Sequence, residues 1–325
     1  MRFLSDFYAN REDGMKKIFK STFIFLLGLA TLGAVYHFYS GHLDGKSYPV
    51  RGQLVDIGGY ELHAELLGQG NITVVFDAGM GDSALAWHKV AKEVSKVARV
   101  LLYDRAGLGK SDVSPLVRSS TNIVNELNSL LEELKIEGPI ILVGHSFGGL
   151  NMQLFAQRHL DKVAGLVLVD SASMNQLDKL PTSSLLRSSL LKLGMLAAPV
   201  GVPRLYLSLD NPEEHAEKST VKHQYTTLDE ANGFKKSTAE VKSEHINLKN
   251  LPVAIISRNY PSKDLQGRRD ASNRNVIWAS LQEELLKLST KSSIIHTHNR
   301  HHTIHRNQPQ LVVDVILAMV DGITK

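Results

Sequence analysis

Apolar and polar residues follow one another in a pattern that predicts a long apolar start and then alternating strands and helices. A diglycine at 58–59 divides two alternating runs, which predicts a β-hairpin at 53–66. After it, short apolar runs alternate with helical periodicity, as in a mostly parallel sheet covered by helices on both faces. The remaining predicted strands are 72–76, 99–103, 140–143, 166–169, 253–257 and 292–296, and the clearest helices are 150–159, 277–288 and 310–323.

This alternation is interrupted once, between Ser171 and Pro252. A leucine-rich stretch there is followed by Pro199 and Pro203 and then by polar and charged residues. We interpret about 171–252 as a helical cap inserted between two strands. The predicted organisation is a basic segment at 1–20, a membrane helix at 21–43, and one α/β domain at 49–325 that carries the cap.

The first apolar stretch is the best candidate for a membrane-spanning helix. Residues 21–43 contain no Asp, Glu, Lys or Arg, and the part from 23 to 36 is nearly all apolar, which is enough to cross most of a bilayer. Three lysines between 16 and 20 precede it, and three aromatic residues between 36 and 39 close it, as in a cytoplasmic basic flank and an interfacial aromatic belt. We expect a single-pass anchor with the domain on the non-cytoplasmic side. A cleaved signal peptide and secretion is the alternative, although Leu32-Gly33-Ala34 matches an A-x-A site poorly; a buried core helix is a third.

Composition sets limits on the rest of the chain. The chain has 325 residues, 43% of them hydrophobic, which is enough for one sizeable α/β domain. Its net charge is +4, and residues 1–20 contribute +2 through five Lys/Arg against three Asp/Glu. The nearly balanced remainder argues against a nucleic-acid surface. Cysteine is absent, so neither a disulfide framework nor a thiolate nucleophile is available.

The strongest chemical signal is the run Gly144-His145-Ser146-Phe147-Gly148-Gly149. It has the pattern G-x-S-x-G, with a predicted strand before it and a predicted helix after it, as in a nucleophile elbow. Such a turn strains the backbone at the serine and exposes its hydroxyl at a helix N-terminus. The alternative is a tight strand-to-helix turn whose serine has no chemical role.

A glycine-rich loop, Asp77-Ala78-Gly79-Met80-Gly81, follows the predicted strand 72–76. Acyl transfer needs two backbone N–H groups directed at the developing oxyanion, one of them from the residue after the nucleophile and one from a neighbouring loop. Phe147 and Met80 are the candidates. The loop could equally be an ordinary strand-to-helix connection.

A second loop follows the predicted strand 99–103 and ends in Gly-Lys-Ser, as a phosphate-binding loop does. Its sequence is Tyr103-Asp104-Arg105-Ala106-Gly107-Leu108-Gly109-Lys110-Ser111. That motif needs a glycine five positions before Gly109, where this chain has Asp104. The carboxylate would repel a phosphate. The sequence therefore does not predict nucleotide binding.

The glycine-rich loop 77–81, the loop 103–111 and the elbow 144–149 follow one another along the chain in the order usual for the α/β-hydrolase superfamily, which this chain resembles. The resemblance extends from Pro49 to the C-terminus and is weak over the middle. It implies a cap over the nucleophile that shapes the substrate pocket, and a structural role for the loop 103–111 beside the oxyanion hole. Many members have His-Gly where this chain has Ala78-Gly79.

Five histidines lie within ten positions near the C-terminus: His296, His298, His301, His302 and His305. The run 296–301 approximates the H-x-H-x-D-H pattern of metallo-β-lactamase-like hydrolases, but Arg300 occupies the aspartate position and cannot bind a cation. No metal site is predicted. The resemblance instead implies a general base at His302, whose spacing to Gln308-Pro309 fits the family; His301 and His305 are the alternatives.

The acid that would orient this histidine has two candidates. In the commonest family arrangement it lies shortly beyond the strand 253–257, where the nearest aspartate is Asp264. Other relatives use the end of the preceding strand, where this chain has Asp170. Either choice keeps the chain order serine, acid, histidine, and we favour Asp170.

These residues predict a membrane-anchored serine hydrolase that cleaves a carboxylic ester, or an amide, of a small molecule without a metal or organic cofactor. A serine at the elbow argues against haloalkane dehalogenase and epoxide hydrolase chemistry, which needs a carboxylate there. Peroxidase, thioesterase, carbon–carbon hydrolase and acyltransferase activities stay open on the same site. A ligand receptor that keeps the fold without turnover is the alternative from another class.

Overall fold

The computed structural model describes the chain except for residues 1, 181–183, 208–210, 259–268, 299 and 325. The chain divides into two compact units, which are described separately. The smaller unit combines Met1–Pro49 with Leu193–Val221, and the larger unit combines Val50–Lys192 with Lys222–Lys325.

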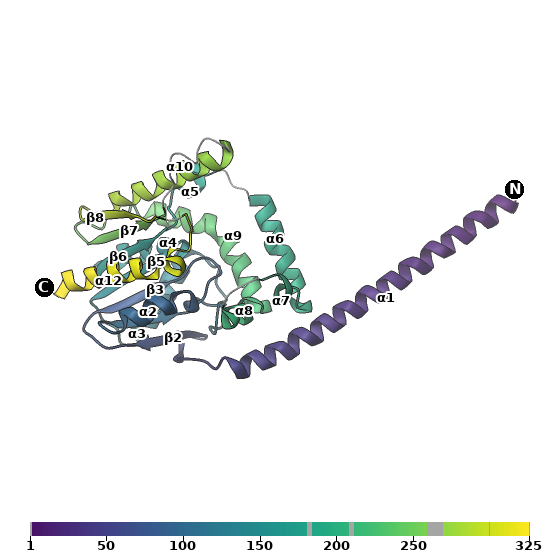
Figure 1. Cartoon of the computed structure of the whole chain (residues 1–325), viewed down its shortest axis with the longest axis horizontal. Helices are drawn as coiled ribbons and strands as arrows, with labels where there is room; N and C mark the ends of the chain where they lie inside the picture. Colours follow the sequence, from purple (N-terminus) through teal and green to yellow (C-terminus); the bar gives the residue numbers. More distant parts are fainter. Residues whose placement is uncertain (1, 181–183, 208–210, 259–268, 299, 325) are drawn as a thin grey trace. The chain divides into compact units, whose positions relative to one another are not determined.

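The larger unit is built on a sheet whose described strands have the order β1-β2-β4-β3-β5-β6-β7-β8 (Figure 1). β2 pairs antiparallel with β1 and with β4, and all other neighbours are parallel. The strands are β1 Gln53–Asp56, β2 Glu61–Leu67, β3 Thr73–Asp77, β4 Arg99–Tyr103, β5 Ile140–His145, β6 Val163–Val169, β7 Val253–Ser257 and β8 Ser292–His296. Because β3 to β8 are parallel, their C-terminal ends share one edge of the sheet, where polar side chains from distant segments can meet.

Helices connect these strands. In the larger unit they are η1 Ala84–Trp87, α2 His88–Val94, α3 Ser120–Glu133, α4 Phe147–Arg158, α5 Gln176–Lys179, α9 Val221–Ser243, α10 Arg269–Glu284, η4 Leu285–Leu288, α11 Ile304–Asn307 and α12 Pro309–Thr324. The smaller unit contains α1 Arg2–Ser47, η2 Ala198–Val200, α7 Pro203–Tyr206 and α8 Pro212–Lys218, and α6 Ser184–Ala197 passes from one unit to the other.

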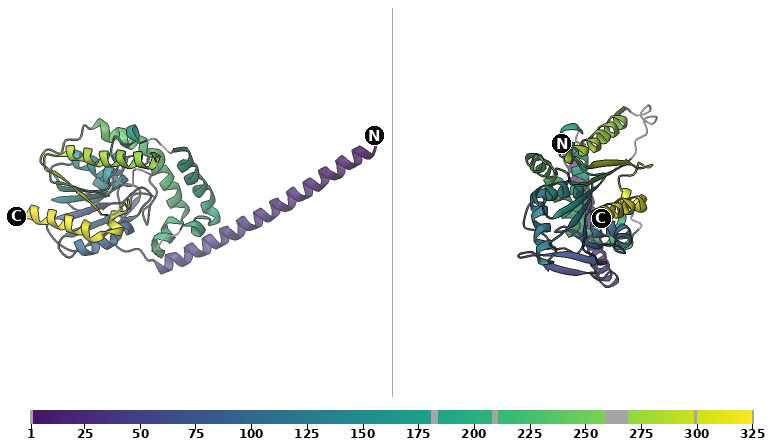
Figure 2. Two further views of the ribbon diagram at one scale, coloured as in Figure 1. Left: turned by 45° about the horizontal axis from the view of Figure 1, so that its top comes forward. Right: turned by 90° about the vertical axis from the view of Figure 1, so that its left-hand side faces the viewer.

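Two apolar layers cover the two faces of the sheet. On one face, the leucine-rich sides of α3, α4 and η4 pack on alternate strand residues such as Val75 and Leu142. On the other face, α2 and α12 pack on Val74 and Val143. The right-hand view of Figure 2 shows α12, in yellow, on the opposite side of the sheet from α3 and α4. Neighbouring residues of one strand thus serve opposite layers, which is why the central strands are apolar throughout.

The predicted fold class is confirmed. The hairpin at 53–66 is present, and β4, β7 and β8 have the predicted bounds. β5 is longer than predicted and continues through Gly144 and His145, because these residues pair with Asp77 of β3 and Val169 of β6. The helices α5 to α9 lie between β6 and β7, where an insertion is predicted.

In the smaller unit, α1 runs without a break through both the basic segment and the apolar stretch that follows it. Its part from Gly14 to Ser47 is long and apolar enough to cross a membrane, with a mean hydropathy of 1.9 in its most apolar window. None of that window is buried against protein. By length and composition, α1 is therefore a candidate membrane span.

Candidate active site

The predicted elbow is a sharp turn between β5 and α4. Ser146, the single residue between them, has φ 51° and ψ −117°, a conformation in which a non-glycine residue is strained. The turn is possible because its neighbours lack side chains. A Cβ on Gly144 would lie 2.5 Å from the Cα of Gly149, and a Cβ on Gly148 would lie 2.4 Å from the carbonyl oxygen of Asp77. Ser146 is half-buried at the C-terminal edge of the sheet.

Asp170 lies next to this turn because β5 and β6 are neighbours. Ser146 N–H donates to the carbonyl of Val169 (3.2 Å), and Ala172 N–H donates to the carbonyl of Ser146 (2.8 Å). Asp170 is fully buried and has a left-handed φ of 44°. Its Oδ2 accepts a hydrogen bond of 2.5 Å from Nδ1 of His302. The structure therefore brings the favoured acid and the predicted base together at the same edge as Ser146.

The other carboxylate oxygen of Asp170 is held by two residues that the sequence analysis did not identify. Trp278 Nε1–H donates to Oδ1 (2.9 Å), and the backbone N–H of Arg258 lies 3.4 Å from the same atom. The guanidinium of Arg258 forms an ion pair with Oδ2 (3.2 Å) and lies over the Trp278 ring. Burial lowers the pKa of Arg258, and Asp170 partly offsets that effect. These contacts fix the carboxylate so that one oxygen faces His302.

His145, the residue before the serine, connects the elbow to the chain segment that carries His302. Its Nε2–H donates to the backbone carbonyl of His302 (3.0 Å), and the two imidazole rings lie 4.6 Å apart. The ring of His305, in α11, lies 4.4 Å from the ring of His145. Burial, followed by the neighbouring charges of His305 and His302, lowers the pKa of His145 well below its ordinary value. A neutral His145 can thus hold the His302 backbone without adding charge to the site.

The glycine-rich loop is held in place by a fully buried arginine. Arg105 donates to the carbonyl oxygens of Ala78 and Gly79, both at 2.7 Å, and forms an ion pair of 2.5 Å with Asp77. In a trans peptide, the C=O of Gly79 and the N–H of Met80 point in opposite directions. Arg105 therefore turns the Met80 N–H away from itself. Neither this N–H nor that of Phe147 has a hydrogen-bond partner among the described residues.

Helix α9 supplies the second half of this support. Glu230 is fully buried and binds Arg105 through both carboxylate oxygens, at 2.7 and 3.0 Å. It also accepts a hydrogen bond of 2.8 Å from the N–H of Gly81, while Nε2 of His223 lies 2.8 Å from the carbonyl of Gly81. Both sides of the Gly81 residue are thus fixed by the predicted cap. Glu230 has no local sequence signature, because its partners lie more than a hundred positions away.

The other candidates lie elsewhere. His301 is exposed, and His305 is buried with its ring 4.4 Å from that of Trp87. The hydrogen bond to Asp170 comes from His302 rather than from either alternative. Asp264 lies outside the described residues. Within the described part of the chain, no group of three or more His, Asp or Glu side chains is arranged to hold a metal ion.

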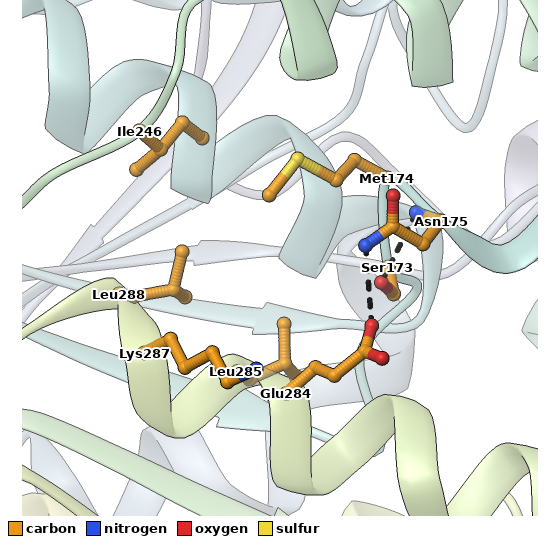
Figure 3. Close-up of a pocket in the computed structure, with 8 residues that line it drawn as sticks. All are labelled: Ser173, Met174, Asn175, Ile246, Glu284, Leu285, Lys287 and Leu288. Atoms are coloured by element: carbon orange, nitrogen blue, oxygen red, sulfur yellow. Dashed lines mark hydrogen bonds between the residues drawn. The ribbon is translucent and has the colours of Figure 1, made fainter.

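One described pocket is lined by Ser173, Met174 and Asn175, which follow Asp170 in the chain, and by residues of α10 and η4 (Figure 3). None of the candidate catalytic residues lines it. Ser173, Asn175 and Glu284 line its polar side, with Asn175 Nδ2 donating to Glu284 at 3.1 Å. Met174, Leu285, two further aliphatic residues and Lys287 line the rest. With a volume of about 190 Å³, it is smaller than the pockets that usually hold organic ligands.

Comparison with known proteins agrees with this architecture. A family model described as the alpha/beta hydrolase fold matches residues 72–241, from the first parallel strand into α9. The chain belongs to this family. The match includes the elbow, the glycine-rich loop and the loop that carries Arg105.

Individual relatives are distant. The uncharacterized protein YqjL of Bacillus subtilis is 26% identical over 245 residues, covering 75% of this chain and 82% of YqjL. The chain spans only 42% and 37% of the length of two further curated relatives. Among solved structures, the epoxide hydrolase CorEH has a TM-score of 0.64 at 18% identity, covering 83% of this chain and 98% of CorEH. An esterase from Exiguobacterium antarcticum has a TM-score of 0.61 at 16% identity, covering 83% of this chain and 99% of the esterase.

Proposed function

We propose that this protein is a serine hydrolase that cleaves a carboxylic ester, or an amide, through an acyl-enzyme. The observation that carries the proposal is the 2.5 Å hydrogen bond between His302 Nδ1 and the buried Asp170, next to the strained Ser146. A carboxylate that accepts from Nδ1 keeps that nitrogen protonated and leaves Nε2 as the basic atom. In this proposal, Ser146 is the nucleophile, His302 the base and Asp170 the acid of a triad.

In the proposed reaction, Ser146 Oγ attacks the substrate carbonyl while Nε2 of His302 removes the hydroxyl proton. The proton passes to the leaving alcohol or amine, whose bond to the acyl carbon breaks. Water then attacks the acyl-enzyme with the same histidine as base, which releases the acid and restores Ser146. Asp170 stays ionised throughout and stabilises the imidazolium form of His302.

The N–H groups of Met80 and Phe147 are the proposed oxyanion hole. Arg105 directs the first of them, and the second is the first N–H of α4, where the helix dipole favours negative charge. The register of β3 and β5 supports this assignment, since Asp77 pairs with Gly144 and both loops leave the same edge of the sheet.

The elbow residue also separates this chain from some of its structural neighbours. Epoxide hydrolases such as CorEH share the fold, but an alkyl-enzyme ester requires a carboxylate nucleophile, and Ser146 has none. The serine chemistry is that of an esterase, and the fold shared with the Exiguobacterium antarcticum esterase is consistent with it. The proposed site acts on a small-molecule substrate and uses no metal or organic cofactor.

The proposal extends to location. α1 acts as a single-pass anchor, with residues 21–43 in the bilayer and the domain at 49–325 on the non-cytoplasmic side. The uncharged span and the lysines before it support this orientation. Residues of about 171–252 act as a cap on that domain, which the contacts of Glu230 with the glycine-rich loop favour.

A serine-directed fluorophosphonate tests the catalytic proposal directly. The full chain in detergent should be labelled once, at Ser146, and should hydrolyse 4-nitrophenyl esters. Ser146→Ala should lose both labelling and hydrolysis and keep its melting temperature, while Ser243→Ala, an exposed serine on α9, should behave as wild type. Full hydrolysis by Ser146→Ala would contradict the proposed nucleophile.

A further inference from the structure

The smaller unit contains a close contact between α1 and the short helix η2. A Cβ placed on Gly33 of α1 would lie 2.4 Å from the carbonyl oxygen of Val200. From the other side, a Cβ on Gly201 would lie 3.2 Å from the carbonyl oxygen of Gly33 and 3.2 Å from the Cβ of His37. The two backbones therefore touch at a place where glycine is required on both segments.

A second contact fixes the direction of the segment along α1. Arg204, at the start of α7, forms an ion pair of 2.6 Å with Asp44, and its side chain is only 5% exposed. Gly33 and Asp44 are eleven residues apart, or about 16 Å along a helix. The segment from Val200 to Arg204 thus lies against that part of α1.

This part of α1 has the composition of a membrane interface. It contains Tyr36, Phe38 and Tyr39, and Asp44 is the first charged residue after the uncharged stretch. In a spanning helix such aromatic residues lie at the level of the lipid headgroups. Gly33 is about 4.5 Å further toward the acyl chains than Tyr36. Val200, whose backbone packs on Gly33, therefore lies at the same depth in the bilayer as Gly33.

The side chains of the packed segment are unusually apolar for a protein surface. Leu193, Leu196 and Leu205 are 63%, 70% and 78% exposed, and Val202 is 37% exposed. They belong to a run, Ser189–Val200 and its continuation into α7, that is apolar over most of its length. Exposed leucines in such a cluster indicate contact with a partner or a membrane.

We propose that residues 193–205, here named the interfacial segment, form a second membrane-binding element that lies in the lipid interface beside α1. This inference rests on the proposed membrane anchor. The partner is the lipid bilayer itself, because the segment is fixed to the stretch of α1 that carries the aromatic belt. The leucines then contact acyl chains, while the Arg204–Asp44 pair lies at the headgroups.

The absence of cysteine makes a depth measurement simple, since any introduced cysteine is unique. The full-length chain is reconstituted in phosphatidylcholine liposomes with an NBD fluorophore on Leu205→Cys, on Leu27→Cys in α1, or on Val97→Cys, an exposed residue of the larger unit. Nitroxide groups on the lipid acyl chains report contact with the bilayer, and aqueous iodide reports contact with water.

We expect the probes at positions 205 and 27 to be quenched by the nitroxide lipids and several-fold less by iodide than the probe at position 97. If iodide quenches the probe at position 205 as strongly as the probe at position 97, while the probe at position 27 is protected, the interfacial segment is not in the membrane. That result would overturn this inference and leave the membrane anchor intact. Iodide quenching at 27 would overturn the membrane anchor first. None of these readings depends on catalytic activity.

A pair of glycine substitutions tests the role of the contact with α1. Gly33→Val places a side chain against the backbone of Val200 and should make the probe at position 205 accessible to iodide. Gly28→Val is the matched control, because nothing lies within 4 Å of a Cβ at Gly28. If Gly33→Val leaves the quenching at 205 unchanged, α1 does not set the depth of the interfacial segment and the inference is wrong.

Discussion

Asp170→Asn is the substitution that tests the proposed triad most closely. Asp170 accepts from His302 on one oxygen and from Trp278 on the other. An asparagine has only one acceptor oxygen. If that oxygen keeps the bonds to Trp278 and Arg258, the amide NH₂ faces His302 and forces Nδ1 to accept. The proton then lies on Nε2, which can no longer take the proton of Ser146.

The size of the effect follows from this tautomer change. We expect kcat to fall by about ten-thousand-fold, the loss found when a triad aspartate of a serine protease is replaced by its amide, or ~5 kcal/mol of barrier. Stability should fall as well, because Asp170 is fully buried and the Arg258 side chain is only 20% exposed, so a neutral amide weakens a largely buried ion pair. A melt measured beside kcat therefore separates a loss of folded protein from a loss of catalysis.

The assay combines hydrolysis of 4-nitrophenyl esters, the rate of fluorophosphonate labelling and a thermal melt. Only an inactive protein that is still folded at the assay temperature supports the reasoning. Trp278→Phe is the matched control, because it removes one hydrogen bond to Asp170 and leaves the His302 bond in place; it should lose far less activity. A normal Asp170→Asn with an inactive Asp264→Asn would refute the argument and make Asp264 the acid.

Two further predictions concern groups around the triad. Glu230→Gln should lower kcat about tenfold with little change in KM, because the amide has no charge and turns an NH₂ donor toward one of the two Arg105 donors or toward the Gly81 N–H, and a displaced oxyanion donor costs less than a lost one. Glu240→Gln on the same helix is the control, and equal kinetics for the two variants would contradict the argument. His145 has a folded pKa below its unfolded value, so the unfolded chain binds more protons and stability falls as the pH drops below about 6.5, by at most ~1.4 kcal/mol per pH unit. Urea unfolding near pH 5 and pH 7.5 should show a weaker loss for His145→Asn; an unchanged loss would mean that His145 is not responsible.

The sequence predicted the central strands well because they pack on both faces and are largely apolar. β4 and β7 were predicted at their true bounds, and so was β8, which is an edge strand and mostly exposed. The end of β5 was missed, since Gly144 and His145 read as the start of a turn, and only pairing with β3 and β6 extends the strand. Local pattern cannot supply that information.

The candidate site was predictable to different degrees. Ser146 has a local signature, and His302 was placed by family spacing. Asp170 was favoured over Asp264, but the sequence left both open, because the choice depends on which strand end lies beside the segment that carries His302. Trp278 and Glu230 were not predicted at all. Each acts through a partner more than a hundred residues away, and no periodicity marks such a pair.

The bond from Glu230 to Arg105 limits how this protein can be diversified. Cap segments are natural places to change substrate preference, since they can be exchanged without altering the sheet. Here, however, α9 also neutralises the guanidinium that orients the glycine-rich loop. A chimera whose new cap lacks a carboxylate at position 230 would leave Arg105 with Asp77 as its remaining described ion-pair partner. In laboratory evolution of this chain, changes in substrate range at α9 and changes in turnover should therefore arise together.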